Sequence, residues 1–192
     1  MALTLAIDLG TTNLKVGLVN EQGEILLVHS CGLQTKSSEP GAAEHDPEEL
    51  KRLLFEMCKK VLTDDYKNQV EYIVSSTYQF GMMMMDEQKK PITPITLLTD
   101  IRSQLTFSDF INSFADEDIY QKTGCPLISQ YVLPRLFYFS TEKPLLFKKA
   151  RYFGDSKSFL FEWLTGKWVT DISTAAATQF YNMHRFQWDE GL

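Results

Sequence analysis

The sequence of 192 residues predicts an α/β fold, with a mixed sheet that begins with an antiparallel three-strand meander and is flanked by helices. Three observations predict this class. Three short strand patterns follow one another at the N-terminus with only brief turns between them. A capped amphipathic helix pattern comes next, and a fourth strand pattern then leads into a region rich in helix patterns.

The first three strands are expected at Leu3–Ile7, Leu14–Val19 and Ile25–Val28. The first is an apolar run, which fits a buried pleated surface. In the second, large apolar residues alternate with Lys15 and Gly17. An Asn-Glu-Gln-Gly turn signal separates the second strand from the third. Because both connections are short, neighbouring strands are expected to pair antiparallel.

A helix is expected to begin at Pro47. Asp46 suits its N-cap, proline suits the first helical position, and Glu49 completes a capping box. The fourth strand is expected at residues 70–74, after this helix. The helix presents an apolar face at helical spacing, made of Leu50, Leu53, Leu54, Met57, Cys58, Val61 and Leu62.

Four consecutive methionines, Met82 to Met85, have two interpretations. They could form a soft metal site or an adaptable ligand surface. Core filling in a strand is the favoured interpretation, because the polar residues 86–90 that follow are typical of a hairpin turn.

The second half of the chain predicts mainly helices. They are expected at Ser103–Phe114, Ile119–Gly124, Val132–Phe139 and Ser156–Leu164, the second ended by Gly124 and the last followed by a glycine. Residues 172–178 read as a polar stretch of small side chains. No internal repeat or linker divides the chain, so one domain over residues 1–192 is expected.

Composition excludes several classes of protein. The net charge of −6 disfavours a nucleic-acid or anionic-membrane surface. Cys31, Cys58 and Cys125 lie far apart, which suits reduced thiols and gives no metal-ligand spacing. No signal peptide and no membrane-spanning run is recognised, so a cytoplasmic protein without a membrane or nucleic-acid partner is expected.

The turn between the first two strands carries the clearest chemistry. Gly10 allows close approach of a ligand, and the N–H groups of Gly10, Thr11 and Thr12 could converge on an anion. Asp8, at the end of the first strand, could hold Mg²⁺ through water, and Lys15 could add positive charge. The alternative is an ordinary hairpin in which Asp8 caps the turn.

This turn and its surroundings closely resemble the first phosphate loop of the FGGY family of carbohydrate kinases, which belongs to the actin-like, ribonuclease H-like ATPase group. Four later stretches resemble the family in the expected order. Among family members, gluconate kinases look nearest and xylulose kinases next. The five matching pieces are residues 6–24, Asp86–Pro91, Thr99–Arg102, Lys122–Leu127 and Leu164–Thr178.

The resemblance implies ATP as phosphate donor and Mg²⁺ as cofactor, with a small-molecule sugar or sugar acid as acceptor. It implies that Asp8 binds the metal and that Asp8, Gly10, Thr11, Thr12 and Lys15 bind the phosphates. A homodimer is left open by the resemblance.

For the sugar, the resemblance implies contacts from Gln79, Phe80, Asp100 and Arg102. Each pair has an alternative. Asp100 could cap a helix while Arg102 is solvated, and Gln79 and Phe80 could be core or strand-end residues. The chain also departs from the family pattern: residues 78–81 contain no histidine, Leu98 replaces a tryptophan, and Ser158 replaces an acid.

The family's catalytic base, second phosphate loop and adenine-binding domain are not found in residues 1–192. The general base is therefore expected beyond Leu192, and the chain is expected to be the N-terminal, sugar-binding domain of a two-domain kinase, inactive by itself. The alternative is a non-catalytic module that senses a sugar or binds a partner. A sugar-responsive transcription regulator is disfavoured, because the first strand begins at Leu3 and leaves no room for a helix-turn-helix before it.

Overall fold

The computed structural model describes residues 2–114 and 116–191, without the side chains of residues 116–118. The chain forms two compact units. The first comprises Met1–Thr35 and His45–Tyr78, and the second comprises Lys36–Glu44 and Gln79–Leu192. The chain crosses between the two units at three points, one of which falls inside the short strand β4 (Glu44–His45).

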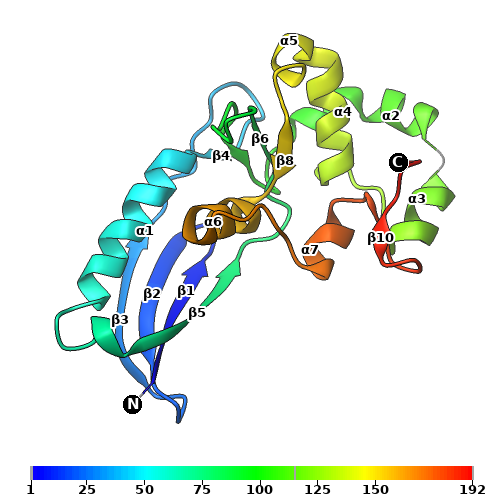
Figure 1. Ribbon diagram of the computed structural model, residues 1–192. Helices are drawn as coiled ribbons and strands as arrows, with labels where there is room; N and C mark the ends of the chain where they lie inside the picture. Colours follow the sequence, from blue (N-terminus) through cyan, green and yellow to red (C-terminus); the bar gives the residue numbers. More distant parts are fainter. Residues whose placement is uncertain (1, 115, 192) are drawn as a thin grey trace. The chain divides into compact units, whose positions relative to one another are not determined.

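The first unit is built on a four-stranded sheet with the order β3-β2-β1-β5. Strands β1 (Leu3–Leu9), β2 (Asn13–Val19) and β3 (Ile25–Gly32) form the predicted antiparallel meander. Strand β5 (Val70–Thr77) pairs parallel to β1, so the sheet is mixed, as the sequence predicts (Figure 1).

Helix α1 (Pro47–Val61) covers one face of this sheet, where it contacts β2 and β3 (Figure 1). It begins where the sequence predicts, because Asp46 accepts hydrogen bonds from the N–H groups of Glu48 and Glu49 at 3.0 and 3.3 Å. The predicted apolar face is buried at Leu50, Leu54, Met57 and Val61.

Strand β5 is one of the two edge strands of the sheet, and the 3-10 turn η1 (Lys67–Gln69) precedes it. Tyr72, Ile73 and Val74 are all exposed, each by more than half. The sequence predicts the strand correctly, but its apolar residues are not covered on either face within the described residues.

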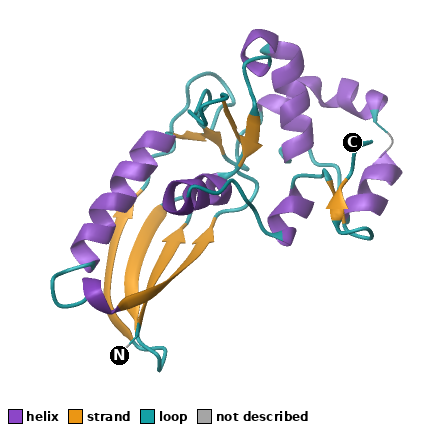
Figure 2. Cartoon of the chain, viewed as in Figure 1, coloured by secondary structure: helices purple, strands orange, loops and turns teal. Residues whose placement is uncertain are grey.

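The second unit is mostly helical and contains only short strands (Figure 2). Strand β6 (Met83–Met85) pairs with β8 (Tyr152–Gly154), and β9 (Tyr181–Asn182) pairs with β10 (Gln187–Trp188). The remaining elements are β7 (Ile95–Thr96), η2 (Arg102–Thr106), α2 (Phe107–Ser113), α3 (Asp116–Thr123), α4 (Val132–Glu142), α5 (Pro144–Phe147), α6 (Ser156–Thr165) and α7 (Ile172–Ala177).

The helices differ from the prediction in several places: α3 begins earlier, α4 ends later, and α5 was not expected. Two further differences are larger. The helix expected at Ser103–Phe114 is divided into the 3-10 turn η2 and the helix α2. Residues 172–178 were expected to be only a polar stretch, yet α7 forms there. Asp171 supplies the N-cap of α7, because its Oδ1 accepts the N–H of Thr174 at 2.9 Å. The alanines that follow are good helix formers.

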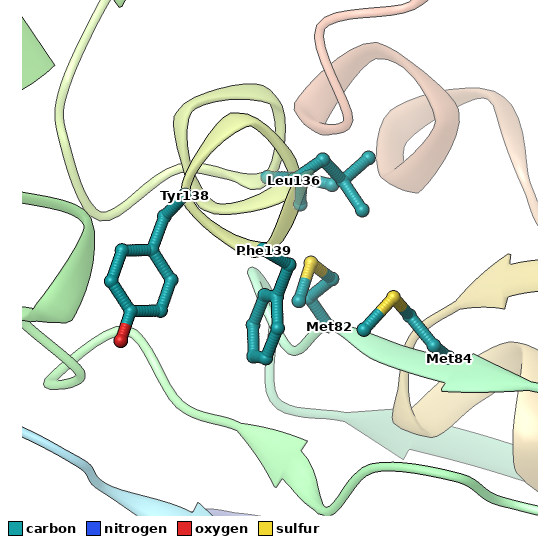
Figure 3. Close-up of a cluster of buried hydrophobic side chains, with 6 residues drawn as sticks. Met82, Met84, Leu136, Tyr138 and Phe139 are labelled. Carbon is teal, nitrogen blue, oxygen red and sulfur yellow. The ribbon is translucent and has the colours of Figure 1, made fainter. Parts of the chain in front are cut away.

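The core of the second unit confirms the interpretation of the methionines as core residues. Met82 to Met85 are all at most 1% exposed. Met82 and Met84 pack with Leu136 and Phe139 of α4, which explains why flexible side chains suit this irregular space (Figure 3). The cluster is completed by Val132 and Tyr138.

No helix among the described residues is both long and apolar enough to cross a membrane.

Candidate functional site

The β1–β2 turn is closed by its own backbone. The Gly10 N–H donates to the carbonyl oxygen of Asn13 at 2.9 Å, and Leu33 N–H donates to the carbonyl oxygen of Thr12 at 2.7 Å. A Cβ at position 10 would lie 3.2 Å from the Asn13 oxygen, so glycine keeps this turn uncrowded. The Gly10 N–H is therefore occupied, and the N–H groups that remain for an anion are those of Thr11 and Thr12.

The charged residues of this turn lie together and face solvent. Asp8 and Lys15 are opposite one another in the β1–β2 pair, and the Lys15 Nζ lies 3.7 Å from the Asp8 Oδ2. Both side chains are more than half exposed, and Thr11 and Thr12 are exposed as well. The structure thus brings together all five residues predicted to hold a phosphate and its metal. A carboxylate that is open to solvent fits Mg²⁺, which keeps several of its water ligands.

A histidine that the sequence analysis did not single out lies buried beside this turn. His45 is 2% exposed, and its Nδ1 lies 3.2 Å from the hydroxyl of Tyr78, whose own N–H donates to the carbonyl oxygen of Leu9 at 2.8 Å. Burial lowers the pKa of His45, while the nearby Thr11 backbone and the charge of Glu49 oppose that shift. Nothing in the sequence singled out His45, because the pattern around it was explained by Asp46 as a helix cap.

The lowered pKa of His45 predicts a pH-dependent stability. A group with a folded pKa below its unfolded value binds fewer protons in the folded state, so stability falls as pH drops through the unfolded pKa, about 6.5. Urea unfolding at pH 7.5 and 5.5 should show a smaller pH dependence for His45→Gln than for the parent chain. Equal pH dependence in His45→Gln and the parent would contradict the assignment.

In the second unit, Arg102 is the centre of a buried ionic cluster. Its Nη1 donates to Glu39 at 2.7 Å, and its Nη2 donates to Glu44 and to Asp100, both at 2.6 Å. Arg102 is 5% exposed and Asp100 is 1% exposed. Lys143 adds a second cation, because its Nζ lies 3.0 Å from the Glu39 carboxylate.

The electrostatics of this cluster favour its charged form. Burial disfavours the charge on Arg102, but hydrogen bonds to Asp100 and Glu39 outweigh burial and raise its pKa overall. Hydrogen bonds from Arg102 and then Lys143 lower the pKa of Glu39. Arg102 is therefore not the solvated side chain of the alternative interpretation. No local sequence pattern indicates that Glu39 and Glu44 bind Arg102, because they lie about sixty residues before it.

The other two predicted sugar residues, Gln79 and Phe80, lie in the connection between β5 and β6. Gln79 is exposed, and Phe80 is half-buried with a φ of 58°, in the left-handed region. The Phe80 ring stacks on Tyr131, with 4.3 Å between ring centroids and 13° between the ring planes. The sequence analysis missed Tyr131, which belongs to the loop before α4.

A cavity of about 960 Å³ opens beside Phe80 in the second unit. Its walls are mainly apolar and include Val132, Leu136, Phe153 and Trp168. Gln79, Asp100 and Arg102 do not line it. The cavity was not predicted, because its walls come from α4, β8, α7 and the loops around them, which no local pattern connects.

Comparison with known proteins identifies similar proteins over nearly the whole chain. Residues 3–192 match the model of the FGGY family of carbohydrate kinases, N-terminal domain. The gluconokinase of Bacillus subtilis is 26% identical over 186 residues, which cover 97% of this chain and 36% of that protein. The xylulose kinase of Staphylococcus xylosus is 27% identical, over 100% of this chain and 40% of that protein.

Two solved structures share the fold. The gluconate kinase from Lactobacillus acidophilus has a TM-score of 0.85 and 25% identity, and the match covers 99% of this chain and 39% of that one. The xylulose kinase from Rhodospirillum rubrum has a TM-score of 0.92 at 20% identity, with the same coverage. The predicted actin-like α/β fold is thereby confirmed. The chain spans about two fifths of the length of the curated relatives it matches. Because the family model covers nearly every residue, the chain belongs to the FGGY family of carbohydrate kinases.

Proposed function

We propose that residues 1–192 are the sugar-binding, first-phosphate-loop domain of an ATP-dependent, two-domain carbohydrate kinase, and that its substrate is gluconate or xylulose. The observation that carries the proposal is the solvent-facing β1–β2 turn, on which Asp8, Thr11, Thr12 and Lys15 gather in a chain of this family. The names of the most similar relatives support these two sugars. A cytoplasmic location fits such a kinase.

On the phosphate side, Thr11 and Thr12 would donate N–H and hydroxyl hydrogen bonds to phosphoryl oxygens, and Lys15 would add positive charge. Asp8 would hold Mg²⁺ through water. The bound ion would neutralise charge that spreads over the phosphoryl oxygens in the transition state. These residues position the phosphates and stabilise their charge.

The reaction transfers the terminal phosphoryl group of ATP to a sugar hydroxyl. The hydroxyl oxygen forms a bond to phosphorus, and the bond from phosphorus to the ADP oxygen breaks. The hydroxyl proton passes to a carboxylate base, which we expect beyond Leu192.

On the sugar side, exposed Gln79 offers an amide and Phe80 an aromatic ring. Asp100 and Arg102 are buried and bonded to each other, so direct contact with the sugar would require one of these bonds to be exchanged. Kinetics of a longer protein that contains this chain distinguish the two roles. Asp100→Asn with an unchanged KM would make Asp100 a structural residue.

The test of the function is a substrate screen. A longer protein that contains this chain is incubated with ATP, Mg²⁺ and gluconate, xylulose, ribulose, glycerol or fuculose, and ADP release is measured. Turnover on gluconate or xylulose supports the proposal. Activity on glycerol alone would contradict the sugar-site assignment. Sugar binding without any turnover would favour the alternative, a non-catalytic sugar-sensing or partner-binding module.

We expect the 192-residue chain alone to show no sugar-dependent ADP release. It offers one phosphate-binding turn, and positioning of both reactants can account for about 7–11 kcal/mol of a lowered barrier. A second phosphate loop and a base are required to obtain that contribution. The same assay applied to the purified chain, with its fold checked by circular dichroism, measures this. Turnover near 1 s⁻¹, the low end for kinases, would show that residues beyond Leu192 are dispensable.

A further inference from the structure

Arg135, in α4, is a buried arginine without a carboxylate partner among the described residues. Its side chain is 1% exposed. Burial lowers its pKa to about 10, so the guanidinium is still protonated at neutral pH. A buried cation must find hydrogen-bond acceptors to offset the loss of water. Arg135 finds them in the backbone.

The guanidinium joins two segments that are far apart in the sequence. Its Nη2 donates to the carbonyl oxygen of Phe80. Its Nη1 donates to the Thr96 hydroxyl at 2.7 Å and to the carbonyl oxygens of Thr96 and Leu97 at 3.2 and 3.3 Å. Its Nε donates to the Tyr131 carbonyl oxygen, one turn back, at 3.3 Å. From its place on α4, this one side chain therefore bonds both the end of the 79–80 stretch and the Thr96–Leu97 segment at the end of β7.

Both joined segments carry proposed sugar-site residues. Phe80 has a positive φ, which is uncommon for a bulky residue and persists only where the surroundings hold it. The Leu97 carbonyl oxygen also accepts the N–H of Asp100 at 3.0 Å. Arg135 thus holds the same carbonyl group that closes the turn leading to Asp100.

We propose that Arg135 is a positioning residue for the sugar site, which holds Phe80 and the turn before Asp100 in one fixed relation. This inference rests on the proposed function and assigns a role to a residue that lies outside the proposed contacts. The planar fork of arginine can bond several acceptors in different directions, whereas a lysine ammonium is a compact charge on a flexible stem. A lysine at position 135, which keeps the charge but not the planar fork, should therefore not restore these hydrogen bonds.

The first test needs no sugar. In Arg135→Lys, the carbonyl ¹³C shifts of Phe80 and Leu97 should change together with the amide shifts of Gly81 and Asp100. Signals from β1 and β2 should stay as in the parent chain. Arg151→Lys is the matched control, because Arg151 is an exposed arginine of the same unit. A change at only one of the two segments would overturn the coupling.

The second test measures sugar affinity, at a temperature where each variant is fully folded. Gluconate and xylulose are titrated into the chain, and Arg135→Lys should weaken binding about 10-fold or more, because small misplacements are costly. A role in stability alone would lower the melting temperature and leave the affinity unchanged, which would overturn the proposal.

Thr96→Val is a milder variant that keeps the side-chain shape; it deletes one acceptor of Arg135 and also the hydrogen bond that the Thr96 hydroxyl donates to the carbonyl oxygen of Met82. It should shift the same carbonyl signals to a smaller extent, and it carries both measurements if Arg135→Lys does not fold. Binding of neither sugar by the parent chain would count against the proposed sugar site. The paired carbonyl shifts would then still decide whether Arg135 couples the two segments.

Discussion

Replacing Asp8 with alanine is expected to lower kcat on the order of 10²-fold or more in a kinase that contains this chain, because charge stabilisation is the main catalytic contribution in phosphoryl transfer. Asp8 lies at the exposed end of β1 and opposite Lys15. Its loss would remove the carboxylate that we assign to Mg²⁺. The measurement is steady-state turnover at saturating ATP and Mg²⁺.

The matched control for Asp8→Ala is Asp64→Ala. Asp64 also forms an exposed ion pair with a lysine, at 2.6 Å from Lys67, but it lies outside the β1–β2 turn. Exposed pairs contribute little to stability, so neither variant should unfold. Near-normal turnover in Asp8→Ala would remove Asp8 from the mechanism.

The 192-residue chain allows a direct test of the same turn. Tripolyphosphate with Mg²⁺ should shift the amide signals of Thr11 and Thr12, and this shift should be lost in Asp8→Ala. The shift should survive in Asp64→Ala.

Replacing Arg102 with methionine is expected to destabilise the chain by about 3–5 kcal/mol, because removal of one partner leaves buried charge uncompensated. Asp100, Glu44 and Glu39 would lose their shared cation. Urea unfolding at neutral pH measures the loss. Arg52→Met, which breaks an exposed pair with Glu56 at 2.7 Å, should cost only about 0.3–0.5 kcal/mol.

A second background distinguishes lost charge compensation from lost packing. Adding Asp100→Asn and Glu44→Gln to Arg102→Met removes two of the unpaired carboxylates, so part of the lost stability should return. The two carboxylate substitutions are also measured separately in the parent chain. If they lower the stability of Arg102→Met by the sum of those two separate losses, the lost packing of the arginine stem, rather than uncompensated charge, explains the effect of Arg102→Met.

Local signals predicted the parts of the fold that depend on neighbouring residues. The Asp46–Pro47 start of α1 was predictable because a cap and its helix are adjacent in the chain. The meander was predictable because strands joined by short turns can pair only in the antiparallel orientation. The residues proposed to bind phosphate could be predicted to lie together for the same reason, since Asp8 and Lys15 flank a single turn.

The arrangement of the residues proposed for the sugar site depends on contacts between distant residues, which no local sequence pattern reveals. Glu39 and Glu44 reach Arg102 only after the chain has folded back over some sixty residues. The stack of Phe80 on Tyr131 and the bond from Arg135 to Phe80 also join residues more than fifty positions apart. The left-handed φ of Phe80 has no local signal either, because it is held by these distant partners.

The loop Lys36–Glu44 has a consequence for how the molecule can be divided. In the sequence, this loop separates the two segments of the first unit. It nevertheless belongs to the second unit, where Glu39 and Glu44 bond Arg102. A piece cut to start at Gln79 would lack both glutamates, so the second unit cannot be excised as one continuous stretch. Its sequence, with Pro40 and Gly41 inside it, has the composition of a surface loop, yet Ala42, Ala43 and Glu44 are buried. A single protease cut between Glu39 and Glu44 would leave these two partners of Arg102 on separate chain ends, although the backbone from Gln79 onward would be uncut.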